Sequence, residues 1–146
     1  MQKKRIIVFH NIPDFLEPTA VQPVLTAFII DKGFGIDQLV YNFVSKERLL
    51  ELNKIYLNHD THTDVITFDY TMNKQLKAEV YISLWAVAIS AKEESQSIEN
   101  ECLRVISHAA LHCMGMQDKT LNQKKQMRVK ENEFIKLFHV KHQSHV

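Results

Sequence analysis

The sequence has no long apolar run, and this absence excludes a membrane-spanning segment. The longest unbroken apolar stretches, such as Ala27 to Ile30, are far shorter than the roughly 20 residues that cross a bilayer. Lys3 to Arg5 and the apolar Ile6 to Phe9 resemble the start of a signal peptide, but His10 ends the run before the minimum of about seven apolar residues. We therefore expect a protein of the cytoplasm with no membrane partner.

Cysteine is also scarce, and no internal repeat, low-complexity block or interdomain linker is present. The two cysteines, Cys102 and Cys113, lie in what reads as one helix, about 16 Å apart at a rise of ~1.5 Å per residue. They cannot pair within that helix, so a disulfide framework is excluded and a reducing compartment is expected. The 146 residues, 45% hydrophobic and 24% charged, have ordinary globular composition. We expect residues 1–146 to form a single domain.

Short runs of β-branched and aromatic residues predict four strands, and apolar residues at helical spacing predict the helices. The expected strands are Arg5–Phe9, Ile36–Val44, Thr63–Tyr70 and Ala78–Ser83. The first expected helix is Val24–Lys32, and Ser45 caps a second, in which Leu49, Leu52 and Tyr56 face the core. A third helix has a buried stripe formed by Ile98, Cys102, Val105, Ala109 and Cys113. The last expected helix is Leu121–His139, with Met127, Phe134 and Phe138 on its inner side. The order β, α, β, α, β, β, α, α, α predicts an α+β fold. It would hold a small mixed sheet of about four strands and about five helices, with an antiparallel pair where the connecting loop is short.

Two histidines one helical turn apart predict a metal site. His108 and His112 project from the same face of the expected helix. Gly115 lets the chain leave the helix, and Asp118 follows at a distance that allows it to fold back toward the same ion. Imidazole and carboxylate are both ligands of Zn²⁺, and three protein ligands leave a fourth position for water, as in catalytic zinc sites. We therefore predict one Zn²⁺ per chain, bound by His108, His112 and Asp118.

The residue after His108 argues against a peptidase. The spacing of the two histidines, Gly115 and Asp118 follows the long zinc signature of the metzincin proteases, with Asp in place of the third His. Zinc peptidases of this pattern carry a Glu directly after the first His as the general base, and here that position is Ala109. Peptide hydrolysis would therefore lack its proton acceptor.

The net charge of +1 hides an asymmetry along the chain. Seven Lys and Arg residues but only two acidic residues follow Asp118, which gives this segment a charge of +5 and the preceding residues −4. A polyanion could be drawn to the basic end, although charge alone favours a solvated helix face.

Four separated segments resemble the YbeY family of bacterial single-strand endoribonucleases. The family motif His-Gly-x-Leu-His-Leu-x-Gly-Tyr-Asp-His is matched by His108, Leu111, His112 and Gly115. Further matches are Leu52-Asn53 with Tyr56, then 63–68, then 79–83, in the family's order and spacing. The departures are Asp118 where the family usually has a third His, glycines replaced by Ala109 and Ala78, Met116-Gln117 in place of Tyr-Asp, and Leu57 where an Arg often stands.

The resemblance implies a zinc-dependent endoribonuclease acting on single-stranded RNA, in the 3′-end maturation of 16S ribosomal RNA and in ribosome quality control. Its partners would be ribosomal RNA or the small ribosomal subunit, and not DNA. Contacts to phosphates would come from Lys124, Lys125 and Arg128 of the basic last helix. The catalytic residues are not assigned, and Asp64 and Glu79, which lie in matched segments, are the candidates.

Two alternatives remain open. The protein could be a ribosome-associated RNA-binding protein with a structural metal, in which Leu57 marks the loss of catalysis. It could also be a metal hydrolase of another substrate, including peptides. His59 and His62 are interpreted as loop residues, and His139, His142 and His145 as part of a C-terminal tail that could bind stray metal.

Overall fold

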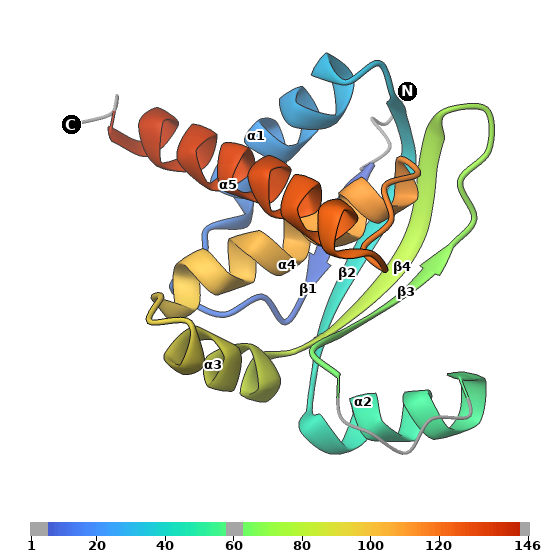
Figure 1. Ribbon diagram of the computed structural model, residues 1–146, viewed down its shortest axis with the longest axis vertical. Coiled ribbons are helices and arrows are strands. Elements are labelled where there is room, and N and C mark those ends of the chain that lie inside the picture. The colour runs from blue at the N-terminus through green and yellow to red at the C-terminus, as the bar shows by residue number, and fades with distance from the viewer. Residues whose placement is uncertain (1–5, 58–62, 144–146) are drawn as a thin grey trace.

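A four-stranded mixed sheet forms the centre of the protein (Figure 1). The computed structural model describes residues 6–57 and 63–143. The strands are β1 (Ile7–His10), β2 (Gly35–Val44), β3 (Val65–Asp69) and β4 (Gln75–Ser83), in the spatial order β1-β2-β4-β3. Strands β1, β2 and β4 run parallel, and β3 is antiparallel to β4, as its short connection requires. The predicted α+β fold class and mixed sheet are therefore confirmed.

The helices occur in the predicted order along the chain. They are α1 (Pro18–Asp31), α2 (Lys46–Leu52) with a π-helical turn η1 (Asn53–Leu57), α3 (Leu84–Glu93), α4 (Ile98–Cys113) and α5 (Leu121–Gln143). Helix α5 runs alongside α4 and α1, whereas α2 lies apart from them at the bottom of the view (Figure 1). Within the described residues, no helix is both long and apolar enough to cross a membrane.

Two predicted element starts differ from the structure, and one predicted core residue is exposed. Helix α1 begins at Pro18 rather than near Val24. Proline suits the first turn of a helix, because a backbone N–H at that position would have no acceptor within the helix. Strand β4 begins at Gln75, before the predicted start. Tyr56 is 62% exposed rather than in the core, because the wider π turn breaks the 3.6-residue spacing that would align it with Leu49 and Leu52. Expected strand residue Arg5 lies outside the described residues.

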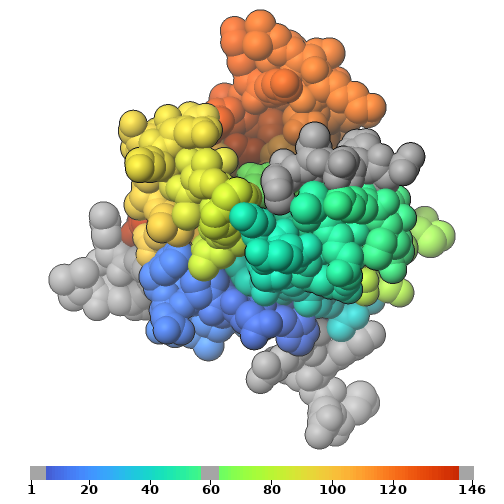
Figure 2. Space-filling view, turned by 90° about the horizontal axis from the view of Figure 1, so that it is seen from below, coloured from blue at the N-terminus to red at the C-terminus, as the bar shows by residue number. Residues whose placement is uncertain are grey.

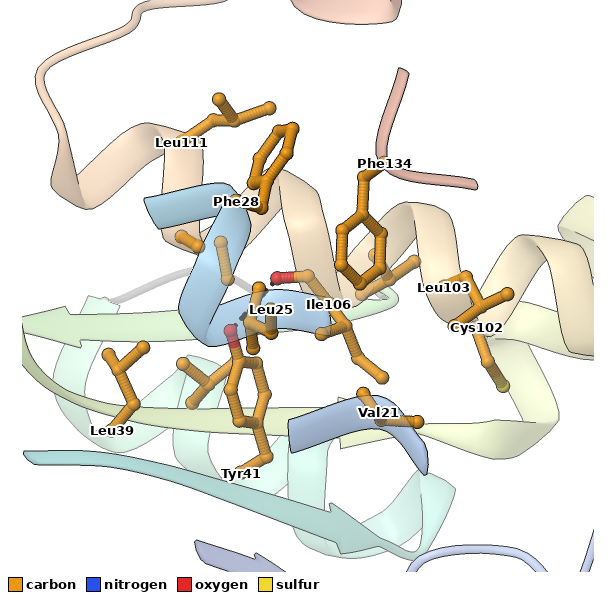
Figure 3. Packing of buried hydrophobic residues seen from close by; sticks show 14 of the residues in the cluster. Val21, Leu25, Phe28, Leu39, Tyr41, Cys102, Leu103, Ile106, Leu111 and Phe134 are labelled. Carbon is orange, nitrogen blue, oxygen red and sulfur yellow. Dashed lines mark hydrogen bonds between the residues drawn. The ribbon is translucent and has the colours of Figure 1, made fainter. Parts of the chain in front are cut away.

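One face of the sheet carries the main core. Leu39 and Tyr41 of β2 lie in register with Ala78 and Val80 of β4, and all four are buried. Apolar residues of α1, α4 and α5 cover this face (Figure 3). The Tyr41 hydroxyl donates a buried hydrogen bond of 2.9 Å to the carbonyl of Ile106 in α4. This contact joins α4, two residues before His108, to the centre of the sheet.

Helix α4 begins and ends where its sequence specifies. The Ser97 hydroxyl caps the first turn by accepting a 3.0 Å hydrogen bond from the backbone N–H of Asn100. The predicted buried stripe is confirmed from Cys102 onward, whereas Ile98 in the first turn is 40% exposed. Gly115 follows the helix at φ +98°, a left-handed conformation that favours glycine and turns the chain back.

A reciprocal pair of side-chain hydrogen bonds sets the start of α5. The Thr120 hydroxyl accepts from the backbone N–H of Gln123 at 3.1 Å, and the Gln123 amide oxygen accepts from the N–H of Thr120 at 3.0 Å. This arrangement is a capping box, which the sequence Thr-x-x-Gln encodes directly. Because it fixes the helix start, it also fixes which side of α5 faces α4. The predicted inner residues Met127, Phe134 and Phe138 are all buried.

Candidate functional site

A hollow of about 360 Å³ lies between α4, α5 and the start of β3. Helix α4 contributes Arg104 and His108, and α5 contributes Lys124 and Arg128. The remaining lining residues are Asp64, Val65, Ser90, Glu94, Glu101, Val105, Asp118, Met127 and Glu131. Figure 2, which views the molecule from below, shows the orange segment of the chain around residues 110–125 projecting at the top, beyond α3. The fold thus gathers in one place residues that the sequence offered separately as metal, catalytic and phosphate-binding candidates.

His108 and Asp118 face each other at the mouth of this hollow. The Nε2 atom of His108 lies 3.3 Å from the Oδ2 atom of Asp118. The His108 side chain is 29% exposed and that of Asp118 is 48% exposed. The turn at Gly115 brings the carboxylate back toward the helix that the chain has just left. Two ligand atoms on one tetrahedral zinc ion, with bonds of about 2.0–2.1 Å, are roughly 3.3 Å apart, so this pair fits two ligands of one such ion.

The third predicted ligand is not gathered with this pair. His112 occupies the next turn of α4, is exposed, and does not line the hollow. Across residues 6–57 and 63–143, no three His, Cys, Asp or Glu side chains form a group that could hold a metal ion. The structure therefore brings together two of the three predicted ligands, and the three-ligand zinc site stays a prediction.

The other ring nitrogen of His108 contacts a buried carboxylate. The Nδ1 atom lies 2.7 Å from Oε2 of Glu131, whose side chain is only 6% exposed. The hydrogen bond to Glu131 is the largest influence on the pKa of His108 and raises it. Burial opposes this rise, while the negative charges of Glu131, Asp118 and Asp64 add to it. The imidazole is thus held between two carboxylates, one buried and one at the surface.

Arg104 connects this carboxylate to a second buried acid. Its Nη1 atom donates to Oε1 of Glu131 at 3.1 Å, and its Nη2 atom donates to the amide oxygen of Asn132 at 2.9 Å. Its Nε atom forms an ion pair of 3.3 Å with Oε1 of Glu101, without the geometry of a hydrogen bond. Burial raises the pKa of Glu101, and the charges of Arg104 and Arg128 lower it. One guanidinium therefore neutralises two acids in the wall of the hollow.

The two catalytic candidates lie on different sides of the sheet. Asp64 lines the hollow beside β3, and its pKa is raised, chiefly by burial. Glu79 is exposed in β4 between Ala78 and Val80, which face the core, so its side chain points to the opposite face. Of the two, only Asp64 shares the hollow with His108.

The three predicted phosphate contacts also separate. Lys124 and Arg128 are one turn apart on α5, and both line the hollow. Lys125 is exposed but does not line it, because successive residues of a helix point about 100° apart. Two cations of α5 therefore face the site, and the third faces elsewhere.

A family model described as Endoribonuclease YbeY matches residues 15–139. The chain belongs to the YbeY family. It is 38% identical to the Endoribonuclease YbeY of Flavobacterium psychrophilum over 138 residues, which cover 93% of this chain and 99% of that protein. The same-named protein of Chlorobium limicola is 30% identical over 88% of this chain and 89% of its own length. The solution structure of TM1509 from Thermotoga maritima, at 23% identity, has a TM-score of 0.67 and covers 97% of this chain and 93% of that one, which shows a shared fold.

The side chains of Leu57 and of five histidines outside the predicted metal site either do not line the hollow or lie outside the described residues. Leu57, where the family often has Arg, ends the π turn η1, and its side chain lies outside the described residues. The same holds for His59 and His62, and for the side chains of His142 and His145. His139 is placed away from the hollow, where its Nε2 atom lies 2.6 Å from Oδ1 of Asn100.

The sequence prediction missed Glu131, although a signal for it was present. Glu131 lies four residues after Met127 and three before Phe134, so it occupies the buried stripe of α5 at helical spacing. An acidic residue inside an apolar stripe is costly unless a partner neutralises it, and therefore predicts a buried contact. The identity of that contact depends on how α5 docks on α4, which spacing within one helix does not reveal.

Proposed function

We propose that this protein is a zinc-dependent endoribonuclease that cuts single-stranded RNA in the cytoplasm. We expect its role to be the 3′-end maturation of 16S ribosomal RNA and ribosome quality control, with ribosomal RNA or the small subunit as partner. Membership of a family whose curated relatives are named endoribonucleases supports the RNA-cutting part of this expectation. The observation that carries the proposal is the hollow in which the His108–Asp118 pair faces two cations of α5, Lys124 and Arg128.

The proposed metal ligands are His108, His112 and Asp118. The first and last already have a ligand-like separation of 3.3 Å. His112 is one turn from His108, and no hydrogen bond or ion pair within the described part of the chain restrains its exposed ring. A zinc ion held by these residues would supply Lewis acidity toward a phosphodiester oxygen, or would lower the pKa of a bound water molecule. As a ligand, the Asp118 carboxylate would add a negative charge that a third histidine would not, and this charge would weaken the Lewis acidity of the zinc ion.

The other residues of the hollow have distinct proposed roles. Lys124 and Arg128 bind and orient the phosphates of the RNA on the side facing α4. Asp64 is the proposed proton acceptor, because burial raises the pKa of its carboxyl group toward the range that suits a general base. Glu79, on the opposite face of the sheet, has no proposed part in the reaction.

Cleavage of single-stranded RNA by the purified protein, with and without chelator, tests this function. The wild type should cut RNA only when zinc is present, and His112→Ala should lose both zinc and cleavage. His139→Ala is the matched control, because it removes a histidine that lies away from the hollow. RNA binding without cleavage would instead favour a ribosome-associated binding protein with a structural metal. Cleavage of casein but not RNA would favour a peptidase.

Charge reversal on α5 tests the RNA surface. Lys124→Glu with Arg128→Glu changes the two cations that line the hollow, and Lys130→Glu with Lys136→Glu makes the same change in charge elsewhere on the helix. The first pair should weaken RNA binding by more than tenfold and reduce its dependence on salt, whereas the second should have a much smaller effect. Equal losses in the two variants would contradict a phosphate-binding role for the hollow.

A further inference from the structure

His108 contacts a different carboxylate at each of its two ring nitrogens. A neutral imidazole carries one N–H and one lone pair, and the group that contacts each nitrogen decides which is which. Oε2 of Glu131 lies 2.7 Å from Nδ1, and Oδ2 of Asp118 lies 3.3 Å from Nε2. The contact with Glu131 is the shorter, and it is buried, whereas Asp118 is half exposed. In the neutral ring, this geometry favours the proton on Nδ1, with the lone pair of Nε2 toward Asp118.

Arg104 favours the same tautomer, because it keeps Glu131 a hydrogen-bond acceptor. A guanidinium has donors and no acceptor, so the oxygen of Glu131 that faces Arg104 must accept a hydrogen bond. The carboxylate can accept from Arg104 through Oε1 and from His108 through Oε2 at the same time. An ionised carboxylate carries no proton, so both of its oxygens can accept a hydrogen bond, one from Arg104 and one from His108.

We propose that Glu131, oriented by Arg104, is a positioning residue that fixes His108 as the Nδ1–H tautomer and so directs its Nε2 lone pair toward Asp118. The inference rests on the proposed function, because an Nε2 lone pair beside a carboxylate serves a cation bound between them. Carboxylate–histidine contacts of this kind orient metal ligands, and their loss weakens metal binding by about 10–100-fold.

Replacing Glu131 by Gln separates positioning from packing. The amide is nearly the same size, so a purely structural role would survive. Its oxygen must face the donors of Arg104, since the opposite orientation would set NH₂ against N–H. The amide NH₂ would then donate to Nδ1 of His108 and move the ring proton to Nε2. We therefore expect Glu131→Gln to invert the tautomer.

Glu101→Gln is the matched control. Glu101 is as buried as Glu131 and forms an ion pair with the same Arg104, but its carboxylate forms no hydrogen bond or ion pair with His108. It therefore reports the effect of removing one buried charge beside the guanidinium while the contact between Glu131 and His108 remains.

Two measurements test the proposal on the full chain. Long-range ¹H–¹⁵N NMR of the metal-free protein, at a pH where the ring is neutral, identifies the tautomer of His108, whose signals are assigned by their absence in His108→Ala. Titration with zinc alone gives the affinity. We expect Nδ1–H in the wild type and Glu101→Gln, Nε2–H in Glu131→Gln, and zinc binding at least about tenfold weaker in Glu131→Gln than in Glu101→Gln.

The proposal is overturned if Glu131→Gln keeps the Nδ1–H tautomer, or if its zinc affinity stays within twofold of that of Glu101→Gln. Failure of the proposed function has a different signature. In that case the tautomer inverts and zinc binding weakens as expected, but the wild-type protein leaves RNA intact.

Discussion

Arg104 should stabilise the fold strongly, because its guanidinium contacts two buried carboxylates at once. Both Glu101 and Glu131 are 5% exposed, and Arg104 contacts each of them. Replacement by Met keeps most of the aliphatic stem while removing the charge. Breaking a buried ion pair by deleting one partner typically costs about 3–5 kcal/mol. For a domain of this size, that corresponds to a fall in Tm on the order of 10 °C.

A matched exposed pair gives the control. Arg48 and Glu51 form an ion pair at the same spacing of three residues within α2, but both side chains are at least half exposed. Exposed pairs contribute about 0.2–1 kcal/mol. Urea unfolding followed by circular dichroism should therefore show a loss for Arg104→Met several times that for Arg48→Met.

The loss should also depend on pH. Burial raises the pKa of Glu101 and Arg104 opposes this rise, so Arg104→Met moves the pKa of Glu101 further up. When the pKa of a carboxyl group is higher in the folded than in the unfolded chain, stability falls as the pH rises through the folded value. It is regained below the unfolded value. The deficit of Arg104→Met should be larger near pH 8 than near pH 5. A loss below about 1 kcal/mol, or one equal at the two pH values, would refute this reasoning.

Two further substitutions probe a hydrogen bond beneath α4 and a buried carboxyl group of the hollow. Tyr41→Phe removes the hydrogen bond to the carbonyl of Ile106, which can still accept from a backbone N–H of its own helix. Thermal unfolding should therefore show a fall in stability of only about 0.5–1.5 kcal/mol, with zinc binding unchanged. A larger fall would mean that the hydroxyl also supports packing. Asp64→Asn removes a carboxyl group whose pKa is raised by burial, so urea unfolding should show higher stability near pH 7 and no gain near pH 4, while RNA cleavage falls. Retained cleavage would remove Asp64 from the proposed reaction.

Regular patterns within single elements could be predicted from the sequence. The buried stripe of α4, the stop at Gly115 and the inner face of α5 follow from apolar spacing and from backbone preference, which act over a few residues. The position of Asp118 beside His108 was also predictable, because the connecting turn is short. Each of these features depends only on residues close together in the sequence, which is why the sequence predicts them.

The predictions that failed or fell short concern irregular geometry or contacts between elements. Tyr56 was expected in the core, but a π turn changes the residue spacing there. The contact between His108 and Glu131 joins two helices across 23 positions, and its register depends on the whole α4–α5 interface. Whether His112 joins the pair depends on a side-chain orientation in an exposed position, which sequence spacing does not specify.

The packing of α5 against α4 has a consequence for the order in which the site forms during synthesis. A chain emerges from the ribosome with its N-terminal end first, and a domain generally folds as a unit. The whole sheet and α4 precede α5 in the chain, so His108 emerges before Lys124, Arg128 and Glu131, which complete the wall around it. A nascent chain that ends before α5 would carry the histidine without its buried partner or the two cations. The proposed RNA-cutting site would thus be complete only after α5 has emerged from the ribosome that is making the protein.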